Sequence, residues 1–149
     1  MDNPDPYNLD RFVDAQASNF DDALAELRAG QKQTHWSWYV FPQVRGLGSS
    51  PTSVRYAIGS IAEATAFLAH PVLGSRLRQC VKAMLAHRDL GAGQILGDID
   101  AQKLRSSLTL FLQVAPSEQL FSDALKRYFD GAPDAATLSI LARQAAGAR

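Results

Sequence analysis

The sequence predicts an all-α fold, a compact, multihelical single domain of about eight helices. Apolar residues recur at three- and four-residue intervals along most of the chain, and residues that can cap helices precede several of these stretches. No hairpin signal or internal repeat interrupts them. A chain of 149 residues can bury a core without disulfides. We therefore expect one helical domain over residues 1–149, with residues 1–7 as a flexible tail.

The composition narrows the functional classes. Lys plus Arg and Asp plus Glu number 15 each, so the net charge is zero, which argues against a dominant role in nucleic-acid binding. Cys80 is the lone cysteine, which excludes an internal disulfide and the usual zinc clusters. The acidic N-terminus has no apolar segment, and no apolar run approaches the length of a membrane span. We expect a cytoplasmic protein with no membrane association, no cofactor and no bound metal.

Caps and glycines mark the first two expected helices. Asn8 is placed to cap a helix that starts at Leu9. Asn19 or Asp21 can open a second helix, and Gly30 is the expected end of that helix.

A short helix is expected around the aromatic residues that follow. The alternation in residues 35–41 would also suit a strand, but a single strand would have no partner in a chain this rich in helix signals. We therefore expect a helix that ends at Pro42, followed by a glycine-containing loop over residues 43–50.

A proline and a capping box begin the next two helices. Proline is tolerated at the first helical position, so we expect a helix from residue 51 to Gly59. Ser60 and Glu63 have the spacing of a capping box, in which each side chain satisfies a free backbone donor. The helix that they start is expected to end at the His70–Pro71 step.

The second half of the chain should contain the central helix. Pro71 can be its first residue, and its apolar stripe is Leu73, Leu77, Cys80, Val81, Met84 and Leu85. Residues 89–97 contain three glycines and are expected to form a turn-rich connection. Asp98 or Asp100 can cap the next helix, and two more follow, the last from about Asp134.

The stretch KQTHWSWYVFPQVRGLGSSP, residues 32–51, is where we expect a ligand site. Large rings, polar donors and flexible glycines together suit a binding cleft. Trp36 or Trp38 would stack on a flat ring, and Arg45 would hold a phosphate together with backbone N–H groups of residues 46–50. The alternative for each ring is that it fills the core. The predicted ligand-binding residues are Trp36, Trp38, Gln43, Arg45, Gly46, Gly48, Ser50 and Lys103.

His35 and Asp98 are the candidate catalytic residues. The imidazole of His35 lies within the aromatic stretch, where it could transfer protons or stack on a ligand; the alternative is a structural imidazole that anchors two helices. Asp98 begins the polar segment 98–107, whose charges a solvated helix start also explains. No HExxH, G-x-S-x-G or P-loop signature is present, so these residues do not define a reaction.

Four segments together resemble one bacterial protein family: DRFVDAQ, ALAELRAGQKQTHWSWYVFPQVRGLGSSPTSVRYAI, EATAFLAHPVLGSRLRQC and KLRSSLTLF. The family is known as domain of unknown function 1810, and some of its members are labelled calpastatin. The similarity covers about residues 9–129. It implies a compact multihelical domain and brings no established activity.

A second resemblance, in outline, is to the NADAR family. It rests on an early helix that ends in AQ, on FLAHPVLGSRL and on the acidic segment that follows. That family is associated with NAD and ADP-ribose metabolism, although Leu9–Asp10 stands here where its first motif begins with a glutamate. The resemblance implies binding or hydrolysis of an ADP-ribose or nucleotide derivative, by a glycosidase or related hydrolase. The alternative is a non-enzymatic module that docks a protein partner through residues 35–48.

Overall fold

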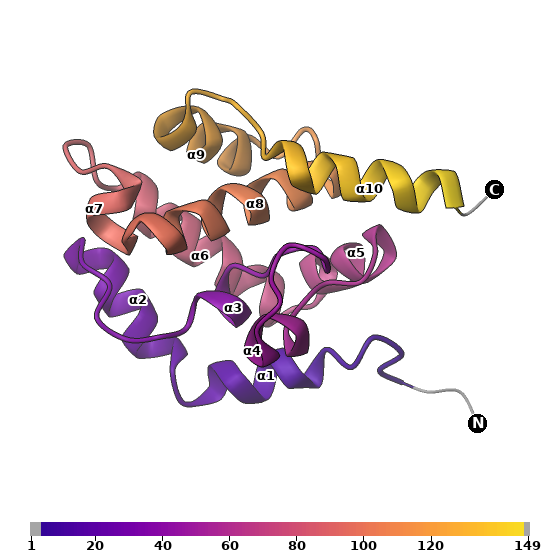
Figure 1. The fold of residues 1–149 in the computed structure, drawn as a ribbon. Helices are drawn as coiled ribbons and strands as arrows, with labels where there is room; N and C mark the ends of the chain where they lie inside the picture. Colours follow the sequence, from indigo (N-terminus) through magenta and orange to yellow (C-terminus); the bar gives the residue numbers. More distant parts are fainter. Residues whose placement is uncertain (1–3, 148–149) are drawn as a thin grey trace.

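The computed structural model describes residues 4–147, and these residues form one all-α domain (Figure 1). The all-α prediction is confirmed, and the described residues form ten helices where about eight were expected. The helices are α1 (Asp10–Ala17), α2 (Phe20–Ala29), α3 (Ser37–Val40), α4 (Pro51–Arg55), α5 (Ile61–Ala69), α6 (Leu73–Leu85), α7 (Ala92–Leu96), α8 (Asp98–Val114), α9 (Gln119–Phe129) and α10 (Ala135–Gly147).

Helices α6 and α8 form the centre of the domain. α6 packs against α2, α5 and α9, while α8 packs against α5, α7, α9 and α10 (Figure 1). The predicted apolar stripe is confirmed for Leu73, Leu77, Cys80, Val81 and Met84, which are buried, and Leu85 is partly buried. A Cβ atom at Gly74 would collide with the carbonyl oxygen of Leu68, so glycine permits the close approach of α5 and α6.

The start of α1 differs from the prediction. Asn8 makes no cap; its backbone is left-handed, with φ 51°, and α1 begins at Asp10. The carboxylate of Asp5 instead accepts hydrogen bonds from the N–H groups of the first turn, at 2.7 and 3.0 Å. Of the predicted flexible tail, residues 1–3 lie outside the described residues, and Asp5 is held against α1 by these two bonds.

Helix α2 has the predicted end and α4 the predicted start, but Asn19, which precedes α2, makes no side-chain cap hydrogen bond. α2 ends at Gly30, whose φ of 81° is the left-handed conformation that glycine favours. The hydroxyl of Ser50 accepts a hydrogen bond from the N–H of Ser53 at 3.1 Å and so caps α4. α4 is shorter than predicted, because it ends at Arg55 rather than at Gly59.

The starts of the two helices that follow agree with the predictions only in part. Ser60 caps α5 by accepting the N–H of Glu63 at 3.1 Å. The second half of the capping box is absent, because Glu63 accepts the N–H of Gly59 at 3.1 Å instead of that of Ser60. α6 begins at Leu73 rather than at Pro71, because the chain first makes a turn.

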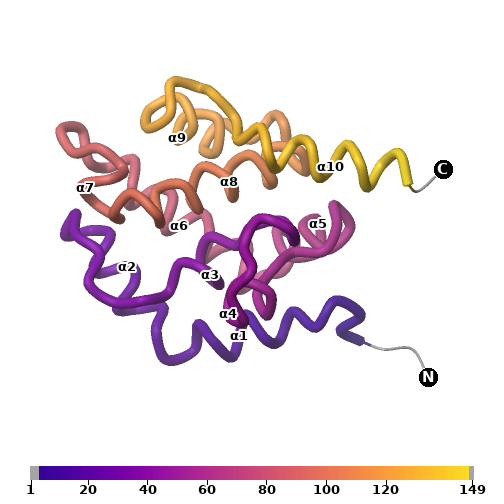
Figure 2. The backbone as a smooth tube through the Cα atoms, viewed as in Figure 1, coloured from indigo at the N-terminus to yellow at the C-terminus, as the bar shows by residue number. Residues whose placement is uncertain are grey.

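The aromatic stretch forms the predicted short helix, α3, and then crosses the domain. It runs between α2 and α5 in the tube view (Figure 2). Beyond Pro42, Val44 forms an isolated parallel bridge with Ile58. The N–H of Arg45 donates to the carbonyl of Ile58 at 2.8 Å, so the bridge places Arg45 beside the start of α5.

The region predicted as a turn-rich connection, residues 89–97, contains the helix α7. The side chain of Gln94 accepts the N–H of Gly91 at 2.6 Å and closes its first turn. The start of α10 agrees with the prediction, because Asp134 accepts the N–H of Thr137 at 3.0 Å and caps the helix. No helix in the described part of the chain is long and apolar enough to cross a membrane.

Candidate functional site

One carboxylate on α2, Glu26, fixes the segment that leads into α3. It accepts hydrogen bonds from the N–H groups of Gln33 at 2.6 Å and Thr34 at 2.8 Å, from the Thr34 hydroxyl at 2.7 Å and from the Trp36 indole at 3.1 Å. Burial alone would raise the pKa of Glu26, but these bonds outweigh it and lower the pKa from 4.5 to about 2. Sequence reasoning missed Glu26, because no local motif links it to its partners.

Trp36 lies in the core, which corrects the prediction that its ring could stack on a ligand. Its exposed fraction is 1%, and its ring centroid lies 6.0 Å from that of Phe41. Tyr39 and Phe41 are also buried. The core alternative therefore holds for these three rings, and Trp38 is the partly exposed ring of the stretch.

A cavity of about 250 Å³ lies between the start of α3 and the start of α8, and we call it the aromatic cavity. It contains three of the predicted site residues, His35, Trp38 and Lys103. The Lys103 ammonium lies 4.8 Å from the centroid of the Trp38 ring, and His35 is exposed. The full lining is Lys32, His35, Ser37, Trp38, Ile99, Asp100 and Lys103.

Asp100 pairs with both lysines of the aromatic cavity, and one positive charge remains unbalanced among these three groups. Its two carboxylate oxygens lie 2.9 Å from the Lys32 Nζ and 2.9 Å from the Lys103 Nζ. Burial works to raise the pKa of Asp100, but the hydrogen bonds and charges of the two lysines outweigh it and lower the pKa. Asp100 is thus an ionised bridge with both oxygens occupied.

The hydroxyl of Ser37 is the unsatisfied polar group of the aromatic cavity. Ser37 is 1% exposed, and its Oγ has no hydrogen-bond partner among the described residues. Ser107 has the same property, but it does not line this cavity. Because buried hydroxyl groups nearly always have a partner, the Ser37 Oγ is an unusual group beside this cavity.

Asp98 and Gln43 lie outside the aromatic cavity. Asp98 is exposed in the first turn of α8, and the carboxylate that lines the cavity is that of Asp100. Gln43 and Gly48 line a much smaller hollow of about 10 Å³, which shares Trp38 with the cavity.

The predicted loop residues Gly46 and Ser50 have structural contacts. A Cβ atom at Gly46, where φ is 109°, would lie 3.2 Å from the side chain of Ile140 on α10. The hydroxyl of Ser50 caps α4 and also donates to the hydroxyl of Ser53 at 2.8 Å. Both residues therefore contribute to the packing of the loop.

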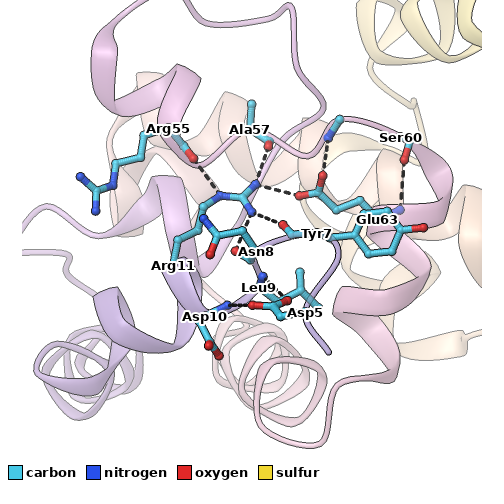
Figure 3. Close-up of polar contacts among 11 residues, drawn as sticks. Asp5, Tyr7, Asn8, Leu9, Asp10, Arg11, Arg55, Ala57, Ser60 and Glu63 are labelled. Atoms are coloured by element: carbon cyan, nitrogen blue, oxygen red, sulfur yellow. Dashed lines mark hydrogen bonds and ion pairs between the residues drawn. The ribbon is translucent and has the colours of Figure 1, made fainter. Parts of the chain in front are cut away.

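Arg45 lines a different cavity, of about 370 Å³, which we call the arginine basin. Its centre is Arg11, whose guanidinium is surrounded by acceptors (Figure 3). The side chains of Arg11 and Glu63 are 10% and 8% exposed, and they form an ion pair of 2.7 Å. The full lining is Pro6, Tyr7, Asn8, Arg11, Arg45, Arg55 and Glu63.

Neither cavity contains an activated nucleophile among the described residues. No hydrogen bond joins His35 to the hydroxyl of Ser37, whose Oγ has no partner in this part of the chain. Cys80 lies in the core, and burial raises the pKa of its thiol to about 12, so the thiol stays protonated and unreactive. The groups assembled here can bind a ring, a polar edge and an anion.

The fold and the cavities define a small all-α domain with one aromatic and one arginine-lined cavity. The chain belongs to the family described as protein of unknown function (DUF1810), whose model matches residues 6–141. The first resemblance found in the sequence is thereby confirmed. No curated protein matches the chain.

A solved structure has the same fold. It is the crystal structure of the conserved hypothetical protein Rv1873 from Mycobacterium tuberculosis, which is 46% identical in sequence. The match covers 93% of this chain and 99% of that chain, with a TM-score of 0.91. The likeness therefore extends over nearly the whole domain.

Proposed function

We propose that this protein binds a small nucleotide-type ligand, such as AMP or ADP-ribose, in the aromatic cavity. The observation that carries the proposal concerns Ser37, a lining residue of the cavity whose buried hydroxyl has no hydrogen-bond partner among the described residues. A buried hydroxyl without a partner costs free energy, and a ligand atom that bonds to it removes that cost.

The other groups of the aromatic cavity suit the parts of a nucleotide. Trp38 supplies a flat wall for a base, and Ser37 can donate to or accept from the edge of that base. The ammonium of Lys103, next to the Trp38 ring, supplies a positive charge for a phosphate group.

The size of the aromatic cavity limits how much of the ligand is enclosed. A volume of about 250 Å³ suits one base-sized ring system better than a whole dinucleotide. The remainder of a larger ligand would pass His35, which is exposed, and reach solvent. AMP and ADP-ribose should therefore share the contacts to the base.

The proposal concerns binding rather than hydrolysis. A general base must be free to accept a proton, and both oxygens of Asp100 are occupied by lysines while its pKa is lowered. Protein docking through residues 35–48 has less support, because three of the four rings of that stretch are buried.

Calorimetric titration with adenosine, AMP and ADP-ribose tests the proposal. We expect saturable binding at one site, and we expect Ser37→Ala to weaken it about tenfold through the lost hydrogen bond. Ser107→Ala is the matched control, because it removes an equally buried and unpartnered hydroxyl away from the cavity. Absence of binding, or equal effects of the two variants, would contradict the proposal.

Tryptophan fluorescence gives a second test. The chain has two tryptophans, of which Trp36 is in the core and Trp38 lines the aromatic cavity. A stacked base should quench the emission of Trp38, and the quenching should vanish in Trp38→Phe. Quenching that persists in this variant would place the ligand elsewhere.

A further inference from the structure

The arginine basin carries an excess of positive charge. Three guanidinium groups and one carboxylate line it, so two positive charges remain unbalanced within its lining. The net charge of the whole chain is zero, and this excess is therefore local. A concave surface with such an excess concentrates anions.

Arg11 has no N–H donor left for an anion, because all five of its guanidinium donors already bind acceptors of the protein (Figure 3). The acceptors are the carbonyl oxygens of Arg55 at 2.8 Å, Tyr7 at 2.6 Å, Asn8 at 2.8 Å and Ala57 at 2.9 Å, and the carboxylate of Glu63 at 2.7 Å. Glu63 also accepts the N–H of Gly59, so both of its oxygens are occupied. The Arg11–Glu63 pair forms a fixed part of the basin.

Arg45 and Arg55 are the free cations of the basin. Neither guanidinium makes a hydrogen bond or ion pair with a described residue, although that of Arg55 lies 5.5 Å from the centroid of the Tyr56 ring. In Figure 3 the Arg55 side chain extends away from the Arg11–Glu63 pair. Arginines in a cavity that lack acceptors have donors available to a ligand.

The backbone positions Arg45 for this task. Its N–H donates to the carbonyl of Ile58, so the residue is anchored at the bridge while its side chain stays exposed. A Cβ atom at Gly59 would lie 3.3 Å from the Arg45 Nη1, so the guanidinium rests against a residue without a side chain. Glycine at this position leaves room for the guanidinium.

We propose that the arginine basin is a second binding site, which takes the phosphate group of a small phosphorylated molecule through Arg45 and Arg55. A phosphate carries the two negative charges that the lining leaves unbalanced, and guanidinium groups bind its oxygens in pairs. A volume of about 370 Å³ holds one such group with its adjoining atoms. The site is separate from the aromatic cavity and does not depend on the proposed function.

Titration with inorganic phosphate and pyrophosphate at low salt, followed by calorimetry, tests the proposal. We expect saturable binding that Arg45→Gln and Arg55→Gln each weaken by about tenfold or more, because a charged hydrogen-bonding group is lost. Arg88→Gln is the matched control, since Arg88 is an exposed arginine that does not line the basin. Circular dichroism establishes that each variant is folded.

Two results would overturn the proposal. One is the absence of saturable binding of pyrophosphate at low salt. The other is an equal effect of Arg45→Gln and Arg88→Gln on the affinity, which would indicate general attraction to positive charge. Adenosine, which has no phosphate, separates this site from the aromatic cavity: its binding should be unchanged in Arg45→Gln, and phosphate binding should be unchanged in Ser37→Ala.

Discussion

The aromatic cavity and the arginine basin hold their positive charges in different ways. In the aromatic cavity one carboxylate, Asp100, accepts hydrogen bonds from both lysines, at 2.9 Å each. In the arginine basin Glu63 pairs with Arg11 alone, at 2.7 Å. The guanidinium groups of the other two arginines of the basin make no hydrogen bond or ion pair within residues 4–147.

The difference determines which groups are left for a ligand. In the aromatic cavity the unmet group is a neutral hydroxyl, that of Ser37, whereas in the basin the unmet groups are cations. Dissolved salt screens exposed charges but hardly affects a neutral hydrogen bond. Adenosine binding should therefore change little with ionic strength, and phosphate binding should fall steeply.

The largest expected effect concerns the fixed pair of the basin. Arg11→Ala should lower the free energy of unfolding by about 3–5 kcal/mol, because it leaves a buried carboxylate without its partner. Glu63 is 8% exposed at its side chain. Four carbonyl groups also lose a donor: two in the segment before α1, one in α4 and that of Ala57. Urea denaturation followed by circular dichroism measures the change.

Arg45→Ala is the matched control for this prediction. It removes the same kind of side chain from the same basin, but one whose guanidinium makes no hydrogen bond or ion pair in the described part of the chain. We expect a change in the free energy of unfolding within about 0.5 kcal/mol. If the two variants lost similar amounts of unfolding free energy, the assignment of Arg11 as a structural residue and of Arg45 as a residue available to a ligand would be wrong.

Elements with local signals were predicted well. The left-handed end of α2 at Gly30, the cap of α10 at Asp134 and the stripe on α6 all depend on residues a few positions apart. α7 was missed because its three flanking and internal glycines indicate turns, and its stability depends on packing against α8. Asn8 was misassigned because the cap of α1 comes from Asp5, earlier in the chain.

The aromatic cavity could be predicted only in part. His35 and Trp38 were found because they lie in one stretch, but the same stretch did not show that Trp36 faces the core. Position within a short helix such as α3 does not determine which ring is buried; the packing around it does. The Asp100 bridge between two lysines needs α8 beside the segment before α3, which is a tertiary contact.

Glu26 fixes the segment before α3 by accepting its hydrogen bonds, much as Glu63 fixes Arg11 in the basin. We expect its contribution to the free energy of unfolding to be smaller. Glu26→Ala should lower the free energy of unfolding by about 2–3 kcal/mol, because four hydrogen bonds to a charged acceptor are lost. Partial exposure to solvent keeps the loss below that expected for Arg11→Ala. Asp14→Ala, on the exposed side of α1, is the control and should have little effect.

The Glu26 contribution should depend on pH in a defined direction. Its pKa is about 2 in the folded protein and 4.5 ordinarily, so its stabilisation is present above pH 4.5 and is lost as the pH falls from there towards 2. The gap in unfolding free energy between the wild type and Glu26→Ala should therefore be constant near neutral pH and narrow in acid. A gap that widens in acid would contradict the lowered pKa.

The smallest expected effect compares the two unpartnered hydroxyls, Ser37 and Ser107, which are each 1% exposed. Alanine removes a desolvated polar group without breaking a hydrogen bond, so the free energy of unfolding should stay the same or rise by up to about 1 kcal/mol. Ser107→Ala should gain more, because Ser107 lies inside the long helix α8, where alanine has the higher helix propensity, while Ser37 is the first residue of α3. Urea denaturation without ligand measures both. If Ser37→Ala instead loses more than about 1 kcal/mol, its hydroxyl has a structural partner in solution, such as a bound water, and the cavity loses the group that distinguishes it from the basin.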